Sequence, residues 1–272
     1  MNIVDSLSVS HGLCACGVCG YEALQPHMTE AQRRGLARRI AHPRTVIVAL
    51  FPYLAPCAPG NLSLYARGRD YHAVATAHLE AAAQALRAAH PDCSFLVLAD
   101  DSPLPEVYAA ACAGLGCIGE NGLLIHPVYG SYVFIGTIVT DLALPAQAHA
   151  PASCLSCGAC HRACPVGLDK SLCLSALTQQ GGILTEEQAA LVRAHPLIWG
   201  CDTCQLVCPM NRGAAQTTEP AFLQGQICSL SLADLDGLTR RQFTQKYPDR
   251  AFTWRGPAPL RRNLMLKQGD TP

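Results

Sequence analysis

CLSCGACHRACPVG, residues 154–167, holds four cysteines in fourteen residues, and CDTCQLVC, residues 201–208, adds three more ahead of Pro209. The first run has the spacing C-x2-C-x2-C-x3-C-P, which is the bacterial ferredoxin pattern. Three thiolates on such a tight loop can reach three irons of one cubane, whereas the fourth serves a second cluster. A structural zinc site is the competing interpretation, although it needs only pairs of ligands, usually two CxxC units well apart.

Cys173 lies between the two runs, so this part of the chain offers eight thiolates, the number that two 4Fe–4S clusters require. The crossing pattern assigns one cluster to Cys154, Cys157, Cys160 and Cys208. It assigns the other cluster to Cys164, Cys173, Cys201 and Cys204. Two neighbouring clusters form a one-electron relay, which implies a redox partner and an electron acceptor.

The composition limits where such a chain works and what it binds. The 272 residues are enough for a sizeable core, and 20 basic residues balance 20 acidic ones, so no overall field favours nucleic acid. The sequence shows no secretory signal and no run of about 18 apolar residues. We therefore expect a cytoplasmic protein without membrane contact, whose sixteen cysteines are thiols or metal ligands rather than disulfides.

Eight cysteines fall outside the cluster assignment. They are Cys14, Cys16, Cys19, Cys57, Cys93, Cys112, Cys117 and Cys228. The stretch CACGVC (14–19) has a spacing that can bind metal, but no fourth ligand is nearby, so small buried thiols are the favoured interpretation. The sequence leaves the role of Cys14, Cys16 and Cys19 open.

Strands and helices are expected to alternate before the cysteine-rich part. The patterns predict strands at 45–51, 94–99 and 131–142 and helices at 29–40, 71–90 and 106–115. This alternation predicts an α/β, or α+β, layer structure. Residues 143–153 are expected to be a linker and 232–247 to be helical. The predicted parts are an α/β domain at 1–150, a ferredoxin-like module at 151–215 and a helical tail at 216–272.

Long motifs in this order resemble the epoxyqueuosine reductase family. They are SLYARGRDYH (63–72), DDSPLPE (100–106), AGLGCIGENGLLIHPVYGSYVFIG (113–136), WGCDTCQLVCPMNR (199–212) and FTWRGPAPLRRN (252–263), together with the cysteine module. The resemblance implies a nitroreductase-like cobalamin-binding domain followed by a two-cluster ferredoxin-like module. It also implies an oxidoreductase of queuosine biosynthesis and tRNA processing, which reduces epoxyqueuosine in the tRNA anticodon loop to queuosine with electrons passing from the clusters to cobalamin.

The resemblance assigns the proton donor of this reaction to an aspartate. Opening an epoxide C–O bond leaves an alkoxide, which must receive a proton from a nearby acid. Aligning DDSPLPE without gaps places this acid at Asp100, with Asp101 as the neighbour to test. The alternative is that the two aspartates cap the helix that follows.

Further cobalamin contacts follow from the same resemblance. Ser63, Tyr65 and Asp70 match the loop that faces the cobalt or the substrate, and Leu124 and Ile135 match strands that line the cofactor. His72 and His126 could be polar contacts, but a structural role is the favoured interpretation for both.

The chain also departs from the family pattern. It ends soon after LRRN, where family members continue into HEAT-like repeats that help to hold tRNA, so it resembles a short form. A local positive balance remains in the tail, and it could grip phosphates or be scattered surface charge. Its cations are Arg240, Arg241, Lys246, Arg250, Arg255, Arg261, Arg262 and Lys267.

Three functions remain open on these grounds. The leading one is an epoxyqueuosine reductase that works as a monomer and takes electrons from an external donor such as flavodoxin or ferredoxin. The second is a cobalamin and iron–sulfur reductase of a small molecule. The third is a non-catalytic electron carrier, for which replacing Asp100 would have no effect.

Overall fold

The chain divides into two compact units in the computed structural model, which describes residues 13–146 and 149–269. Unit 1 contains the described residues of Met1–Pro52, His72–Ser156 and Arg212–Ala215. Unit 2 contains those of Tyr53–Tyr71, Cys157–Asn211 and Gln216–Pro272. The chain therefore passes from unit 1 to unit 2 inside the first cysteine run. The domain boundaries expected from the sequence stay a prediction.

Unit 1 is built on a sheet of four strands in the order β1-β2-β6-β3. These strands are β1 (Ala15–Gly20), β2 (Thr45–Pro52), β6 (Val133–Thr140) and β3 (Phe95–Ala99). Every neighbouring pair is antiparallel, so β2 and β3 run in the same direction with β6 between them. The helix α3 (Tyr71–Ala89) connects β2 to β3. The predicted alternation thus corresponds to the unit β2–α3–β3, with the antiparallel strand β6 inserted between its two strands. The fold is of the mixed α/β class.

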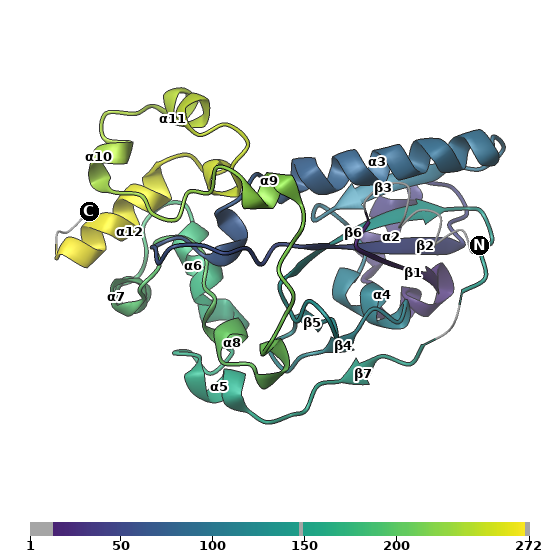
Figure 1. The fold of residues 1–272 in the computed structure, drawn as a ribbon, viewed down its shortest axis with the longest axis horizontal. Coiled ribbons are helices and arrows are strands. Elements are labelled where there is room, and N and C mark those ends of the chain that lie inside the picture. Colours follow the sequence, from purple (N-terminus) through teal and green to yellow (C-terminus); the bar gives the residue numbers. More distant parts are fainter. Residues whose placement is uncertain (1–12, 147–148, 270–272) are drawn as a thin grey trace. The chain divides into compact units, whose positions relative to one another are not determined.

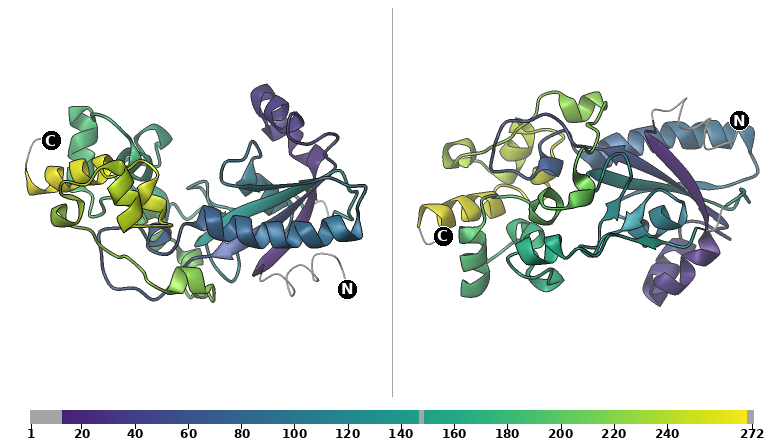
Figure 2. Two further views of the ribbon diagram at one scale, coloured as in Figure 1. Left: turned by 90° about the horizontal axis from the view of Figure 1, so that it is seen from above. Right: turned by 60° about the horizontal axis from the view of Figure 1, so that its bottom comes forward.

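Helices cover both faces of this sheet, with α3 on one and α4 (Glu106–Cys112) on the other (Figures 1 and 2). All eight residues of β2 are buried, as expected for a strand covered on both sides. Val46, Val48 and Leu50 of β2 belong to the core on the α4 face, together with four consecutive alanine and cysteine residues of that helix. On the α3 face, a Cβ at Gly136 would lie 2.6 Å from Leu79 Cδ1, so the glycine lets the helix approach.

Shorter elements complete unit 1. Two 3-10 turns, η1 (Tyr21–Ala23) and η2 (Gln25–His27), lead into α2 (Glu30–Ala37), which begins with a capping box at Thr29. A small sheet has the order β5-β4-β7 and contains β4 (Cys117–Ile118), β5 (Leu124–Ile125) and β7 (Ala152–Ser153). Because β7 pairs in parallel with β4, part of the segment expected to be a linker is anchored to unit 1.

Unit 2 consists of short helices around a core that includes Trp199, Phe243 and Phe252. Its elements are η3 (Leu64–Ala66), α5 (Ala159–Ala163), η4 (Lys170–Leu172), α6 (Leu174–Gln179), α7 (Glu186–Ala194), α8 (Thr203–Leu206), η5 (Pro209–Asn211), α9 (Pro220–Leu223), α10 (Leu232–Leu235), α11 (Arg240–Lys246), η6 (Ala251–Thr253) and α12 (Ala258–Gln268). The last helix packs against α6, α7 and α10 and so ties the end of the described chain to the cysteine-rich segment.

The predicted strands and helices at 29–40, 45–51, 71–90, 94–99, 106–115 and 131–142 are confirmed to within a few residues. The stretch 232–247, expected to be helical, forms two helices, α10 and α11, with a break between them. Gly237 has a φ of 63°, which ends the helical path after α10, and Thr239 caps the start of α11.

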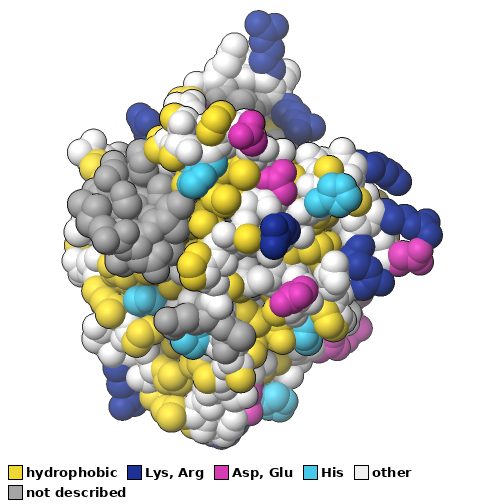
Figure 3. Space-filling view, turned by 90° about the vertical axis from the view of Figure 1, so that its right-hand side faces the viewer, with side chains coloured by type: hydrophobic (Ala, Val, Ile, Leu, Met, Phe, Trp, Pro, Cys, Tyr) yellow, Lys and Arg dark blue, Asp and Glu magenta, His cyan; other side chains and the backbone are white. Residues whose placement is uncertain are grey.

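Charged side chains of both signs are interspersed on the face drawn in Figure 3, in keeping with the net charge of zero. Within residues 13–146 and 149–269, no helix has both the length and the apolar character needed to cross a membrane.

Candidate functional site

Asp100 lies directly after the last residue of β3, and its backbone is in the left-handed region with a φ of 64°. Few residues other than glycine adopt this conformation, although aspartate and asparagine tolerate it best. The carboxylate side chain is 56% exposed. The structure thus places Asp100 at the carboxyl edge of the strand, accessible to a ligand.

His72 contacts this aspartate, since its Nε2 atom lies 2.9 Å from Asp100 Oδ2. Sequence reasoning favoured a structural role for His72 and missed this pairing. The order of the predicted elements could have indicated this pairing. When a strand follows a helix and runs back along it, the last residue of the strand lies beside the first turn of the helix. His72 is the second residue of α3, and Asp100 follows β3.

Glu106 is the buried partner of the same turn and was given no role from the sequence. Its carboxylate lies close to Asp100 and Ser102, and its Oε1 is buried and accepts no hydrogen bond from any described residue. Burial, and after it the neighbouring charge of Asp100, raises the pKa of Glu106 to about 8. At neutral pH this group is therefore mostly a neutral carboxylic acid.

The structure also separates Asp100 from the alternatives raised by the sequence. Pro105 occupies the N-cap position of α4, so helix capping by the aspartate pair is wrong. Asp101 is exposed, and its amide donates to Ala99 O at 2.9 Å. Asp100, rather than its neighbour, is the carboxylate joined to His72.

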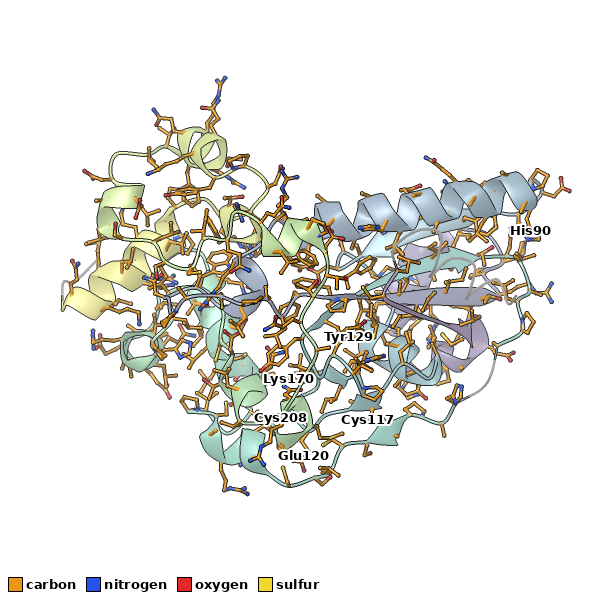
Figure 4. The ribbon with its side chains drawn as sticks, in the orientation of Figure 1. His90, Cys117, Glu120, Tyr129, Lys170 and Cys208 are labelled. Atoms are coloured by element: carbon orange, nitrogen blue, oxygen red, sulfur yellow. The ribbon has the colours of Figure 1, made fainter. Side chains whose placement is uncertain are left out.

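The cysteine runs are brought together in unit 2, where α5 of the first run packs against α8 of the second. Cys208 lies two residues after the end of α8 (Figure 4). Burial is the main cause of a raised pKa at Cys201, and the Cys173 thiol lies close enough to add to it. These two cysteines are assigned to the same cluster, so their proximity supports that assignment.

The donor set fits iron–sulfur clusters. All sixteen cysteines lie in the described ranges, and none of them is in a disulfide. The thiolates of a cubane bind four different irons, and the eight assigned thiols are the number that two such clusters require.

The stretch CACGVC forms most of β1 rather than a ligand loop. Cys16 and Cys19 stand three residues apart in this strand, so their side chains point to opposite faces of the sheet. Burial raises the pKa of each thiol to about 12, and Cys112 contributes at Cys19. Cys19 is a buried packing residue of the core, and Cys16 is half-buried.

Ser63 and Tyr65 lie beside the second cysteine run. The Ser63 hydroxyl donates to Asp202 Oδ1, and its amide donates to Trp199 O at 2.9 Å. Gly200 has a φ of 76°, and a Cβ there would lie 2.4 Å from Ser63 Cβ and 2.8 Å from Tyr65 Cε1. The motifs SLYARGRDYH and WGC thus pack directly on each other, and only glycine fits at position 200.

The other predicted cofactor contacts vary in exposure. Leu124 in β5 is 2% exposed and belongs to the core, whereas Ile135 in β6 and Asp70 are half-buried. His126 Nδ1 accepts from the amides of Val128 and Tyr129, which is a structural role in a turn. Contact of Ser63, Tyr65, Asp70, Leu124 and Ile135 with a cofactor stays a prediction.

Most cations of the tail hold main-chain carbonyl groups of unit 2. Arg262, which is 8% exposed, donates to the carbonyls of Leu177, Gln180 and Gly182. Five more donate to carbonyls in the same way: Arg240, Lys246, Arg250, Arg261 and Lys267. The Arg255 guanidinium stacks 3.9 Å from the centre of the Trp254 ring. These charges are therefore largely engaged in stabilising the fold.

Comparison with known proteins gives one consistent result. Residues 33–101 match the family described as epoxyqueuosine reductase QueG, DUF1730. The chain is 33% identical over 219 residues to the epoxyqueuosine reductase of Lactococcus garvieae. The aligned region covers 78% of this chain and 62% of that protein. It is 32% identical over 259 residues to the enzyme of Synechocystis, covering 90% of each. The chain spans 54–62% of the first three relatives.

Solved structures share the fold. Epoxyqueuosine reductase from Streptococcus thermophilus, and an epoxyqueuosine reductase crystallised with a tRNA-Tyr epoxyqueuosine-modified stem loop, each superpose with a TM-score of 0.82 at 24% identity, covering 97% of this chain and 79% of theirs. The enzyme from Bacillus subtilis, described with an aspartate catalytic loop swung out of the active site, gives 0.81 at 23% identity, covering 97% and 80%. The resemblance seen in the sequence is confirmed: the chain belongs to the epoxyqueuosine reductase family.

Proposed function

We propose that this protein reductively removes the epoxide oxygen of epoxyqueuosine in a tRNA anticodon loop to give queuosine. The observation that carries the proposal is the arrangement at the end of β3, where a strained, exposed aspartate contacts His72 and lies close to the acid Glu106. Strained backbone and a pKa shifted by burial tend to occur together at functional sites. The relatives' activity, and the tRNA stem loop bound by one of them, support the same substrate.

The cofactors belong to this proposal. Cys154, Cys157, Cys160 and Cys208 would hold one 4Fe–4S cluster, and the remaining four thiolates would hold the other. Those four are Cys164, Cys173, Cys201 and Cys204. The proposed architecture is a nitroreductase-like cobalamin domain over 1–150, a ferredoxin-like module over 151–215 and a helical tail.

Ser63 and Leu124 have side chains buried within their own units, so any contact that they make with a corrin would involve their main chain. Tyr65, Asp70 and Ile135 are half-buried and would offer side chains. Bound cobalamin, fed by the clusters, would supply the reducing electrons for C–O cleavage.

The task of the protein's own residues is to deliver a proton. Removing the oxygen breaks both C–O bonds, forms a C=C bond and releases water, so it consumes two electrons and two protons. As the first C–O bond breaks, the oxygen gains charge and a proton from the Asp100 carboxyl neutralises it; a second proton is needed when the second C–O bond breaks and the oxygen leaves as water. His72 Nε2 contacts the same carboxyl and can return a proton to it. We propose that an external carrier such as flavodoxin or ferredoxin donates the electrons and that the protein acts as a monomer.

Anaerobic reconstitution tests the proposal. The full chain is loaded with iron, sulfide and cobalamin, reduced, and given an epoxyqueuosine-bearing anticodon stem-loop. We expect queuosine to form, and Asp100→Asn to lower turnover by about 100-fold or more while cobalamin binding is kept. The control Asp101→Asn should keep turnover. Cobalamin binding with no turnover by the unmodified protein would refute the assigned substrate, and no cobalamin uptake would leave only an electron carrier.

A second candidate is a cobalamin and iron–sulfur reductase of a smaller substrate. The observation that favours it is that six cations of the tail donate hydrogen bonds to carbonyls of the protein itself. These cations are therefore less available to bind phosphates. A protein that grips many phosphates binds less tightly as salt rises. If the free epoxyqueuosine nucleoside is turned over as well as the stem-loop, and salt leaves both rates unchanged, this candidate replaces the first.

A further inference from the structure

Cys201 lies on a stretch of backbone that is held on both sides. Before it, the Gly200 amide donates to Thr178 Oγ1 at 2.9 Å. After it, Asp202 is buried, and its two carboxylate oxygens accept hydrogen bonds from a hydroxyl and an amide of the segment 63–64. The backbone that carries this thiol therefore has little freedom to move.

The Thr203 side chain places a hydroxyl group next to this thiol. Its Oγ1 atom lies 3.4 Å from Cys201 Sγ, which is a hydrogen-bond distance for sulfur. Thr203 is the first residue of α8, and its carbonyl accepts from the Val207 amide, so the helix fixes its backbone. Both Thr203 and Cys201 are half-buried, and water competes less for such a contact than it does at an exposed site.

The direction of this hydrogen bond depends on whether the sulfur carries a proton. A free thiol can donate its proton to the threonine oxygen, because a hydroxyl both donates and accepts. A thiolate bound to iron has no proton and can only accept. With a cluster on Cys201, the Thr203 hydroxyl is therefore the donor and Cys201 Sγ is the acceptor.

We propose that Thr203 tunes the 4Fe–4S cluster to which Cys201 is assigned: its hydroxyl donates a hydrogen bond to Cys201 Sγ and raises the reduction potential of that cluster. The inference rests on the proposed function, in which the clusters carry the reducing electrons. Reduction adds one electron, supplied by the external carrier, and breaks no bond to a ligand. The added negative charge is shared by the cysteine sulfurs, so a donor at one sulfur stabilises the reduced form more than the oxidised form.

Conservative substitutions separate the hydroxyl from the bulk of the side chain. Thr203→Val keeps the branched shape and lacks the hydroxyl, whereas Thr203→Ser keeps the hydroxyl and lacks a methyl group. Thr203→Ala removes the hydroxyl in a smaller side chain and serves as the second test if the valine variant takes up no cluster. Thr244→Val is the matched control, because the Thr244 hydroxyl donates to Arg240 O at 3.1 Å in α11, outside the cysteine-rich segment.

A redox titration of the anaerobically reconstituted full chain, followed by EPR of the reduced clusters, is the measurement. We expect Thr203→Val to make one cluster about tenfold harder to reduce, a fall of about 60 mV in its midpoint potential, and to leave the other cluster unchanged. Thr203→Ala should repeat this fall. Thr203→Ser and Thr244→Val should stay within about twofold, or about 20 mV, of the unmodified protein. Unchanged potentials in Thr203→Val, or an equal fall in Thr203→Ser, would overturn the proposal.

Pulsed EPR detects the hydrogen bond itself. After exchange into D₂O, the reduced unmodified protein and Thr203→Ser should show an exchangeable deuteron coupled to the cluster that Thr203→Val and Thr203→Ala lack. The same exchangeable couplings in all four proteins would mean that the hydroxyl does not contact the sulfur, which would contradict the proposal.

The titration also distinguishes this inference from the proposed function, because it needs no stem-loop. A fall in potential in Thr203→Val, in a protein that turns over no stem-loop, would support the hydrogen bond and refute only the assigned substrate. Turnover of the stem-loop with unchanged potentials in Thr203→Val would leave the function in place and refute only the role of Thr203. A protein that takes up no iron would overturn both.

Discussion

At the scale of single residues, the site joins two carboxyl groups with different surroundings. Asp100 is exposed and paired with His72, whereas the Glu106 carboxyl is buried and lacks a described donor at Oε1. An ionised carboxylate in such surroundings costs free energy, which protonation removes. The protein therefore carries a buried acid directly beneath the residue proposed to deliver the proton.

This buried acid predicts a pH dependence of stability. The pKa of Glu106 is about 8 in the folded protein and 4.5 in the reference state, so the folded protein binds more protons between these values. Stability from this group is complete at low pH and falls as pH rises through 8. At about 1.4 kcal/mol per unit of pKa shift, the loss is on the order of 5 kcal/mol.

Urea unfolding over a pH series checks this prediction. The groups that face Glu106 are Asp100, Ser102 and His72, and all three remain in a Glu106→Gln variant. That variant should show a flatter decline in unfolding free energy between pH 4.5 and 8, while Glu80→Gln should follow the unmodified protein. A decline of the same size in both variants would mean that another group causes it.

At the scale of elements, the middle of α12 is a structural anchor. Arg262 donates to Leu177 O at 3.1 Å, Gln180 O at 2.7 Å and Gly182 O at 2.9 Å, and so satisfies carbonyls at the carboxyl end of α6. Asn263 adds bonds to Thr178 O at 2.7 Å and Ile198 O at 2.8 Å. The motif LRRN thus joins the last helix to the segment that carries the cysteines proposed as cluster ligands.

Replacing this anchor should destabilise unit 2. Arg262→Ala leaves three carbonyls without their donor and should cost about 3 kcal/mol. Arg262→Lys should recover only part of this, because an ammonium lacks the planar fork of donors. Arg241→Ala, at an exposed position, is the control and should stay within about 0.5 kcal/mol. Chemical denaturation measures all three, and equal effects of Arg262→Ala and Arg241→Ala would contradict this role.

The sequence predicted elements whose pattern is local. The apolar run of β2 and the helical spacing of α3 were sufficient, and the observed bounds follow them closely. The sheet order was not predictable, because β6 enters between β2 and β3 through pairing that no local pattern encodes. β1 was missed because its cysteines and glycines are poor indicators of a strand.

Some residues of the candidate site could likewise be predicted from local sequence patterns, and others could not. Spacing suggested the cysteines proposed as cluster ligands, and motif resemblance suggested Asp100 as the proposed acid, since both signals are contiguous in the sequence. The roles of His72 and Glu106 depend on how α3, β3 and α4 meet, which only the fold shows. Likewise, charge alone could not show that Arg262 is buried against carbonyls instead of facing solvent.

At the scale of the whole molecule, the metal clusters should stabilise the two units unequally. Seven of the eight assigned ligands lie in unit 2, and Cys154 lies in unit 1, where its amide donates to Ile118 O at 3.1 Å. Metal binding free energy contributes directly to folding where ligands are drawn from many short elements. Unit 2 has short helices and several small cores, whereas unit 1 has a buried four-stranded sheet.

Removal of one ligand should therefore be visible both as metal content and as local stability. Cys208→Ser should lower iron from about eight to about four atoms per chain, and hydrogen exchange should quicken over 157–211 while β2 and β6 keep their protection. Cys93→Ser, at a half-buried thiol outside the assigned ligands, is the matched control and should keep full iron and full protection. Zinc in place of iron in the anaerobically purified protein, or protection lost equally in both units, would show that the cysteines build a different centre.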